Sequence, residues 1–261
     1  MNVMLRKENF KFFYKMTLAV MGLSLIFGLP TTSNAAFQSG DPNQPNVLVG
    51  RDDDNVDNPE IQPNPDDPNQ SLNNTDIIFG GWYDDVLIGL LGNDQLYGLR
   101  GNDILIGGTE QGETPNSDIM FGGGGHDISI WAPGDGSEFF HGGYGTDAQV
   151  FGLIDRDSDN VPTLDNHMRP SVEVTQSPGF CTLERVEDPD LGFDFLVRFF
   201  VRASGNLAVT VRLKDVEQVF CTSEAGGAIT YANLKDPQPS FNEVSLYEVR
   251  QINNKVGMII R

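Results

Sequence analysis

Aspartate residues recur at a regular spacing in the first half of the chain. Four follow one another every nine residues, and three more continue the series after two wider intervals. They are Asp76, Asp85, Asp94, Asp103, Asp118, Asp127 and Asp147. Carboxylates are hard oxygen ligands, and Ca²⁺ takes roughly six to eight such oxygens in proteins. Their repetition therefore indicates cation binding.

Most of these aspartates stand within a glycine-rich phrase of nine residues. A glycine opens the phrase, and an aspartate takes its sixth position and an apolar residue its eighth in the uninterrupted copies. The opening glycines are Gly80, Gly89, Gly98, Gly107 and Gly122. A glycine in a helix costs about 1 kcal/mol relative to alanine, so this region is not expected to be helical.

The phrase resembles Gly-Gly-x-Gly-x-Asp-x-apolar-x, the nonapeptide of the repeats-in-toxin (RTX) family. The resemblance implies calcium-binding turns, short strands, and a parallel β-roll in which two nonapeptides complete one coil. It also implies that the eighth-position side chains point inward. Leu87 and Leu105 would then stack on one sheet, with Ile78 and Leu96 on the other.

In such a roll, alternate repeats share an edge. The resemblance therefore places Asp76, Asp94 and Asp118 along one edge and Asp85, Asp103 and Asp127 along the other. Strands about 4.8 Å apart would bring these carboxylates close together. Their repulsion favours a bound cation, and glycine turns with φ > 0 allow backbone carbonyls to converge on it.

Calcium is the expected ion because magnesium demands a tight octahedron and keeps its water ligands. Zinc requires Cys or His ligands, but His126, His141 and His167 lack ligand-type spacing and are expected to be surface histidines. Asp155–Asn160 matches the start of an EF-hand-type loop, although Asn166 replaces its bidentate glutamate. This segment is either an extra calcium site or a solvated turn.

The negative charge is concentrated around the repeats. The net charge is -20, and residues 41–160 contain 23 Asp and Glu residues against three Arg residues. Nucleic acids and anionic membranes require clusters of Lys or Arg, so neither is an expected partner. Cations are.

The N-terminus has the pattern of an export signal. Basic residues precede the apolar segment Met16–Leu29, and small residues lead to a predicted cleavage site after Ala35. About 14 apolar residues are too few to span a bilayer, which needs about 20. The pattern predicts a signal peptide at 1–35 and a secreted chain, extracellular or periplasmic, with no membrane span after cleavage. RTX proteins commonly use an uncleaved C-terminal signal instead, so a toxin role is less expected.

Composition divides the rest of the chain into three parts. Residues 36–70 are rich in Pro, Asn and Asp, which predicts an extended linker with a capping coil near 46–55. The calcium-binding β-roll is predicted at 71–152, with an inserted loop at Glu110–Pro115 and an irregular coil at 131–141. Residues 153–261 are expected to form a β-rich domain, so the predicted fold is all-β.

The C-terminal residues alternate as in a sheet with one wet face. Val209, Val211 and Leu213 alternate with polar residues, and Gly205-Asn206 is the expected hairpin turn. We expect a β-sandwich-like cap at the end of the roll. In an oxidising compartment, Cys181 and Cys221 are expected to form a disulfide.

The sequence lacks several catalytic signatures, including His-Glu-x-x-His and Gly-x-Ser-x-Gly. The leading hypothesis is a secreted, non-enzymatic structural or binding module that folds or stiffens with Ca²⁺, with an extracellular carbohydrate or protein as a further partner. One alternative is an exported hydrolase of polysaccharide or lipid. Its candidate residues are Asp155, Asp157, Asp165 and His167. The other is an adhesin whose Trp82, Tyr144 and Trp131 face a carbohydrate.

Overall fold

A computed structural model describes residues 37–50, 76–90, 92–108, 117–158 and 161–261. The predicted signal peptide, most of the predicted linker and the inserted loop Glu110–Pro115 lie outside these residues. Strands dominate the described part, so the prediction of an all-β fold is confirmed. No described helix is long and apolar enough to cross a membrane.

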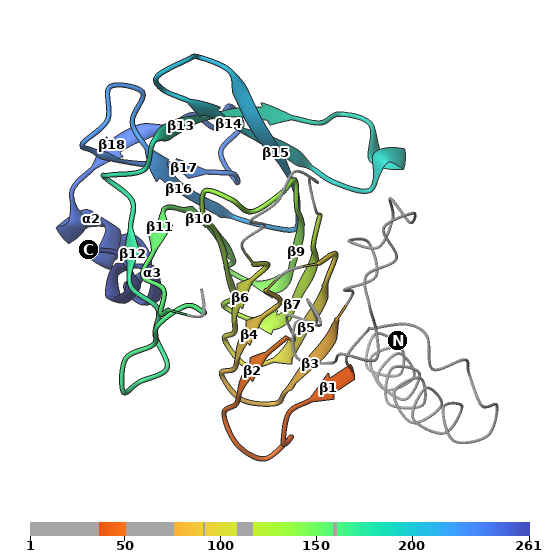
Figure 1. The fold of residues 1–261 in the computed structure, drawn as a ribbon. Helices are drawn as coiled ribbons and strands as arrows, with labels where there is room; N and C mark the ends of the chain where they lie inside the picture. The colour runs from red at the N-terminus through yellow and green to blue at the C-terminus, as the bar shows by residue number, and fades with distance from the viewer. Residues whose placement is uncertain (1–36, 51–75, 91, 109–116, 159–160) are drawn as a thin grey trace, which may run out of the picture. The chain divides into compact units, whose positions relative to one another are not determined.

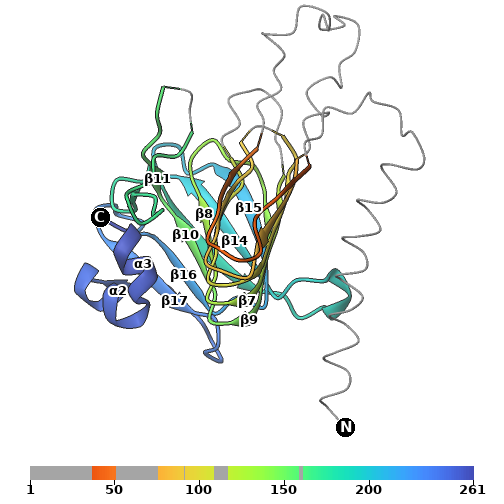
Figure 2. The same cartoon turned by 90° about the horizontal axis from the view of Figure 1, so that it is seen from below.

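The chain builds the roll by alternating between two parallel sheets (Figures 1 and 2). The first sheet contains β1 (Phe37–Ser39), β3 (Ile77–Gly81), β5 (Gln95–Arg100), β7 (Ile119–Gly125) and β9 (Phe139–Gly145). The second contains β2 (Val47–Val49), β4 (Val86–Ile88), β6 (Ile104–Ile106), β8 (Ile128–Trp131) and β10 (Ala148–Phe151). The parallel sheets are those expected of a β-roll.

The interior of the roll is made by the eighth position of the repeat. Ile78 pairs in register with Leu96 on the first sheet, and Leu87 pairs with Leu105 on the second. All four side chains are fully buried, as predicted. Phe140 pairs with Met120 and extends the inward-facing side chains of the first sheet, although it follows an irregular turn. The short strands therefore share one apolar core between the sheets.

Two turns adopt left-handed backbone at residues other than glycine. Leu90 and Leu99 occupy the second position of the repeat with φ of 74° and 75°. This conformation disfavours side chains with a Cβ. At the fourth position, Gly101 has a φ of 114° and lies against the carbonyl of Tyr83 in the neighbouring coil. Glycine is required there by both backbone angle and space.

The C-terminal strands continue both sheets of the roll. The first sheet extends from β9 through β15 (Leu207–Lys214), β14 (Phe195–Val201) and β13 (Gly179–Arg185). The second extends from β10 through β16 (Gln218–Thr222), β17 (Ile229–Asn233) and β18 (Asn242–Val244). The first strand added to each sheet is parallel to the roll, and the next ones are antiparallel.

The predicted alternation in β15 is confirmed because Val211 and Leu213 are fully buried. The turn between β14 and β15 is longer than two residues. It runs from Arg202 to Asn206, and Gly205 has a φ of 69°. The pair β11 (Leu153–Ile154) and β12 (Val172–Glu173) forms a small separate sheet.

Helices cover the outer face of the second sheet (Figure 2). They are α2 (Leu246–Ile252) and α3 (Asn254–Ile259). A short 3₁₀ helix, η2 (Pro189–Leu191), lies between β13 and β14 in the chain. Val249 and Val256 pack with Ile106 and Ile130 in a second apolar cluster. On the first sheet, Phe79, Tyr97 and Phe121 form a stacked column with centroid separations of 4.7 and 5.0 Å.

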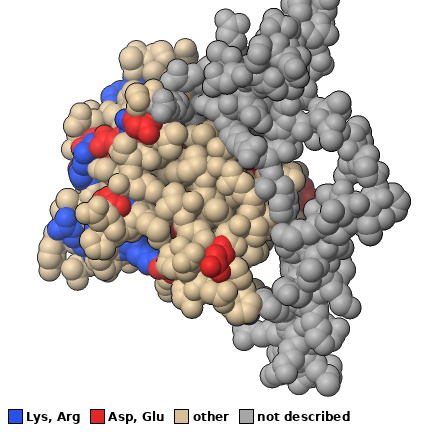
Figure 3. Space-filling view, turned by 60° about the horizontal axis from the view of Figure 1, so that its bottom comes forward, with Lys and Arg blue, Asp and Glu red and all other residues tan. Residues whose placement is uncertain are grey.

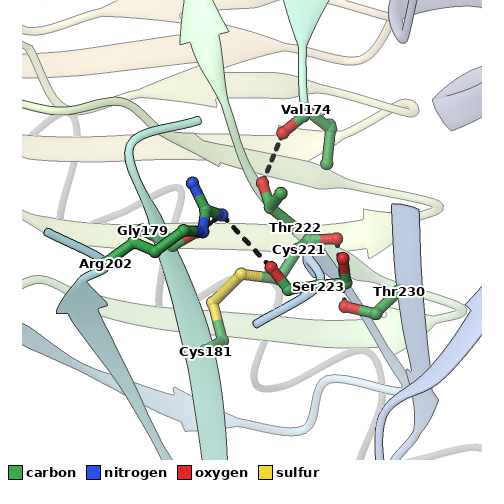
Figure 4. Close-up of a disulfide and its surroundings, with 8 residues drawn as sticks. All are labelled: Val174, Gly179, Cys181, Arg202, Cys221, Thr222, Ser223 and Thr230. Atoms are coloured by element: carbon green, nitrogen blue, oxygen red, sulfur yellow. Dashed lines mark hydrogen bonds between the residues drawn. A yellow bond between two sulfur atoms is a disulfide. The ribbon is translucent and has the colours of Figure 1, made fainter. Parts of the chain in front are cut away.

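The predicted disulfide is present and joins the two sheets (Figure 4). Cys181 lies on β13 and Cys221 on β16, with their Cα atoms 6.2 Å apart. Beside it, the Arg202 guanidinium donates hydrogen bonds to the carbonyls of Gly179 and Ser223 at 2.6 and 3.1 Å. The bond and the arginine together fasten the two sheets at this end.

Candidate metal centre

The predicted aspartates form two rows along the two edges of the roll. Row one contains Asp76, Asp94 and Asp118, which precede strands of the first sheet. The backbone N–H of Asp76 donates to Asp94 Oδ1 at 2.7 Å, and that of Asp94 donates to Asp118 Oδ1 at 2.8 Å. One oxygen of a carboxylate thus links each coil to the previous one.

Row two repeats the arrangement on the opposite edge with Asp85, Asp103, Asp127 and Asp147. Each of its three N–H···Oδ1 links between successive members is 2.8 Å long. Asn46 caps this row, because its backbone N–H and its Nδ2 donate to Asp85 Oδ1 at 2.6 and 2.8 Å. The rows therefore use Oδ1 to set the register of the coils.

The second carboxylate oxygen has a different environment. Oδ2 is buried and lacks a hydrogen-bond partner among the described residues at four positions, Asp103, Asp118, Asp127 and Asp147. A buried polar atom without a partner is costly, and charge increases that cost. These oxygens are therefore available to a cation.

At several first-position glycines, a space brings Oδ2 of the sixth-position aspartate close to a backbone carbonyl. A Cβ added to Gly80 would lie 2.6 Å from Asp85 Oδ2 and 2.7 Å from the carbonyl oxygen of Gly98, one coil further on. We call this space the cradle. Gly89 and Gly98 have cradles of the same kind, with the carbonyls of Gly107 and Gly122. Any side chain at the first position would displace these oxygens.

Burial makes the row carboxyls hard to ionise without a counterion. It raises the pKa of Asp103 from 3.8 to about 9, and the negative charges of Asp127 and Asp85 add to that rise. Burial also raises the pKa values of Asp118, Asp127 and Asp147 to about 7. A bound cation would displace the protons that these groups otherwise hold near neutral pH.

The oxygen donors are carboxylates mixed with backbone carbonyls. Within the described ranges, no three His, Cys, Asp or Glu side chains gather around one point. A coordination shell would thus need carbonyl oxygens, which suit Ca²⁺ and not Zn²⁺. On the face drawn in Figure 3, the Asp and Glu side chains of the described residues form separate small patches. The aspartates of both rows are buried.

A family model for the RTX calcium-binding nonapeptide repeat, which spans four copies, matches residues 79–110. These residues are RTX repeats. RTX repeats bind calcium, and the matched segment contains the row members Asp85, Asp94 and Asp103. No curated protein and no solved structure matches the chain.

Beyond the RTX match, two glutamates occupy row positions that the sequence analysis did not identify. Glu138 follows Asp118 in row one, and Glu217 follows Asp147 in row two. Counting nine residues back from Asp147 reaches Glu138, so the period carried a signal within the predicted irregular coil. Glu217 carried none, because its turn between β15 and β16 has only three residues, 215–217.

The candidate residues of the hydrolase alternative are not members of either aspartate row. Asp155 pairs with Arg261, and Asp165 pairs with Arg169 at 2.6 Å. The Asp157 side chain accepts a hydrogen bond from the Val161 N–H, and the last two residues of the EF-hand-like segment lie outside the described part. Of the predicted surface histidines, His126 and His167 are exposed and His141 is half-buried.

One part of the adhesin hypothesis is wrong. Trp131 is only 2% exposed and donates hydrogen bonds inward to the carbonyls of Asp135 and Gly136, so it cannot face a carbohydrate. Trp82 and Tyr144 are exposed, as that hypothesis requires. Exposed aromatics alone do not identify a ligand.

Proposed function

We propose that this protein is a secreted calcium-binding β-roll whose repeats fold or stiffen when Ca²⁺ fills the two rows. The observation that carries the proposal is the set of buried Oδ2 atoms without hydrogen-bond partners, which lie beside first-position glycines. The proposed ligands are these Oδ2 atoms and the carbonyl oxygens of successive first positions, including those of Gly98, Gly107 and Gly122.

Calcium supplies positive charge where the chain has little. Residues 76–152 contain twelve Asp and Glu residues and a single Arg. Each filled site stabilises the folded state by about 1.4 kcal/mol at a tenfold excess of calcium over its Kd. Several sites together would therefore decide whether the roll is folded. Low calcium would keep it open before export, and high calcium outside would close it.

The proposed role is structural or binding and not enzymatic. The carboxylates that would take part in a hydrolase are held in local ion pairs or turn hydrogen bonds, as at Asp165 and Asp157. We further propose that residues 153–261 act as a β-sandwich-like cap, since their strands continue both sheets of the roll. The proposed signal peptide, residues 1–35, would deliver the chain by the general export route.

The test is a calcium titration of residues 36–261 after chelation, followed by far-UV circular dichroism, with magnesium as the control ion. We expect a calcium-specific gain of β signal and a higher Tm. Asp103→Asn keeps an oxygen for the Asp85 N–H but replaces Oδ2 with a donor, so it should raise the calcium midpoint. Asp190→Asn, at an exposed residue, is the matched control. A full β signal in chelator with no response to calcium would refute the proposal.

A further inference from the structure

The last turn of row one differs from the repeats that precede it. It runs from Ala132 to Glu138, and Glu138 takes the place of the sixth-position aspartate. The backbone N–H of Phe139 donates to the Asp118 carbonyl at 2.9 Å, just as that of Ile119 donates to the Asp94 carbonyl at 2.8 Å. The backbone of Glu138 is therefore in repeat register, although the turn is irregular.

The Glu138 side chain reaches the cradle of Gly107. A Cβ added to Gly107 would lie 2.6 Å from Glu138 Oε1 and closer still to Asp118 Oδ2. At Gly80, Gly89 and Gly98, the oxygen that lies beside this point together with the aspartate Oδ2 is a carbonyl oxygen of a neighbouring coil. At Gly107 it is a second carboxylate.

Burial makes this pair significant. Both side chains are fully buried, and Asp118 Oδ2 lacks a hydrogen-bond partner while it faces the cradle. Two carboxylates that converge in a buried space repel each other unless a cation lies between them. Two negative charges also match a divalent ion better than one carboxylate and a neutral carbonyl do.

The end of row two provides an internal comparison. Glu217 Oε2 accepts a hydrogen bond from the Asp147 N–H at 2.7 Å, and its Oε1 lies 3.6 Å from Lys235 Nζ. The cradle of Gly142 has a carbonyl, that of Asp215, beside Asp147 Oδ2. At the end of row two, a positive charge beside the glutamate is therefore supplied by Lys235 of the protein itself.

We propose that Asp118 and Glu138 together bind one Ca²⁺ at Gly107, in a two-carboxylate site that the irregular turn creates. This inference rests on the proposed function and deepens it. Because affinity for calcium rises with the number of charged ligands, this is the tightest site of the roll. The site also lies at the junction with the C-terminal strands, since the Arg212 N–H of β15 donates to the Glu138 carbonyl at 3.0 Å.

The test compares Glu138→Gln with Glu217→Gln in residues 36–261 by isothermal titration calorimetry with calcium. Both changes remove one charge at the end of a row. We expect Glu138→Gln to weaken the tightest binding event at least tenfold, and Glu217→Gln to leave that event within twofold of the wild type. Equal tight binding in Glu138→Gln and the wild type would overturn the inference. A wild type without any calcium binding would instead overturn the proposed function.

Thermal unfolding in the presence of a chelator shows whether Glu138 is a calcium ligand or a residue that serves packing. Without calcium, Glu138→Gln removes a buried charge next to Asp118, so its Tm should equal or exceed that of the wild type. With saturating calcium, its Tm should be the lower of the two. A lower Tm in chelator, or failure to fold, would show that Glu138 serves packing and would overturn the inference.

Discussion

The repeats and the C-terminal region share two sheets, yet they are stabilised by different means. Residues 76–152 hold twelve acids against one Arg, and residues 153–261 hold sixteen acids against eleven basic residues. The C-terminal region has a disulfide and ion pairs such as Arg198–Glu184 and Lys214–Asp194. In the repeats, the buried row carboxylates instead have neighbours of the same sign.

The difference shows how one continuous sheet can combine a conditional part with a permanent part. The disulfide and the ion pairs of the C-terminal region are formed between residues of the chain itself. The proposed cations of the repeats must come from solution. The C-terminal strands β15 and β16 can then provide a folded edge on which the last coil of the roll assembles.

The largest expected effect is a dependence on pH that is confined to the calcium-free repeats. The folded-state pKa of Asp103 is about 9, and those of Asp118, Asp127 and Asp147 are about 7, all above the ordinary value of 3.8. Their contribution to stability is complete below pH 3.8 and is lost as the pH rises through the folded-state values. Each group therefore makes the calcium-free roll less stable as the pH rises across that window.

We therefore expect the Tm in chelator to fall steadily from pH 5 to pH 8. Saturating calcium should remove this fall, because the ion replaces the protons. Circular dichroism melts at four pH values, with and without calcium, measure both effects. A Tm in chelator that rises over this range would contradict the burial argument. Hydrogen exchange should place the loss in the roll strands and not in β13 and β14.

The second effect concerns the disulfide. Replacing both Cys181 and Cys221 by alanine opens a loop of 40 residues, which should cost roughly 3 to 4 kcal/mol of unfolding free energy in saturating calcium. Chemical denaturation measures that loss. The number of calcium ions bound should stay the same, because neither cysteine lies near a row. Loss of calcium sites in this variant would mean that folding of the repeats depends on the stability of the C-terminal region.

The sequence predicted the features that repeat and missed those that depend on distant parts of the chain. The nine-residue period, together with the resemblance to RTX repeats, placed the inward Leu87 and Leu105 and both rows of aspartates, because every copy repeats the same local geometry. The disulfide was predictable from two cysteines in a chain with a predicted export signal. The alternation in β15 correctly placed Val211 and Leu213 in the core.

Glu217 and Trp131 show why the rest was not predictable. Glu217 enters row two only because β15 and β16 add a further coil, which pairs residues far apart in sequence. Trp131 has the composition of a binding residue, yet its indole N–H is satisfied by the carbonyls of its own turn. Neither outcome follows from local pattern, since both depend on how the irregular turns fold back.

The smallest expected effect tests a contact between a C-terminal lysine and the acidic residues of the roll. Lys255 of α3 lies 3.0 Å from Asp84 Oδ2 and donates to the Asn102 carbonyl at 3.3 Å. The side chains of Lys255 and Asp84 are 39% and 55% exposed, and such exposed pairs contribute at most about 1 kcal/mol. Lys255→Met should therefore lower stability in chelator by about 0.5 to 1 kcal/mol.

Calcium affinity should move in the opposite direction from stability. Lys255 lowers the pKa of Asp127 through its positive charge, so it already offsets part of the field that attracts calcium. Removing that charge should tighten calcium binding slightly, and more at low salt than at high salt. Asp84→Asn in a double-mutant cycle isolates the pair. If Lys255→Met weakened calcium binding, α3 would be holding the roll in shape, and the repeats would depend on the C-terminal region for more than a folded edge.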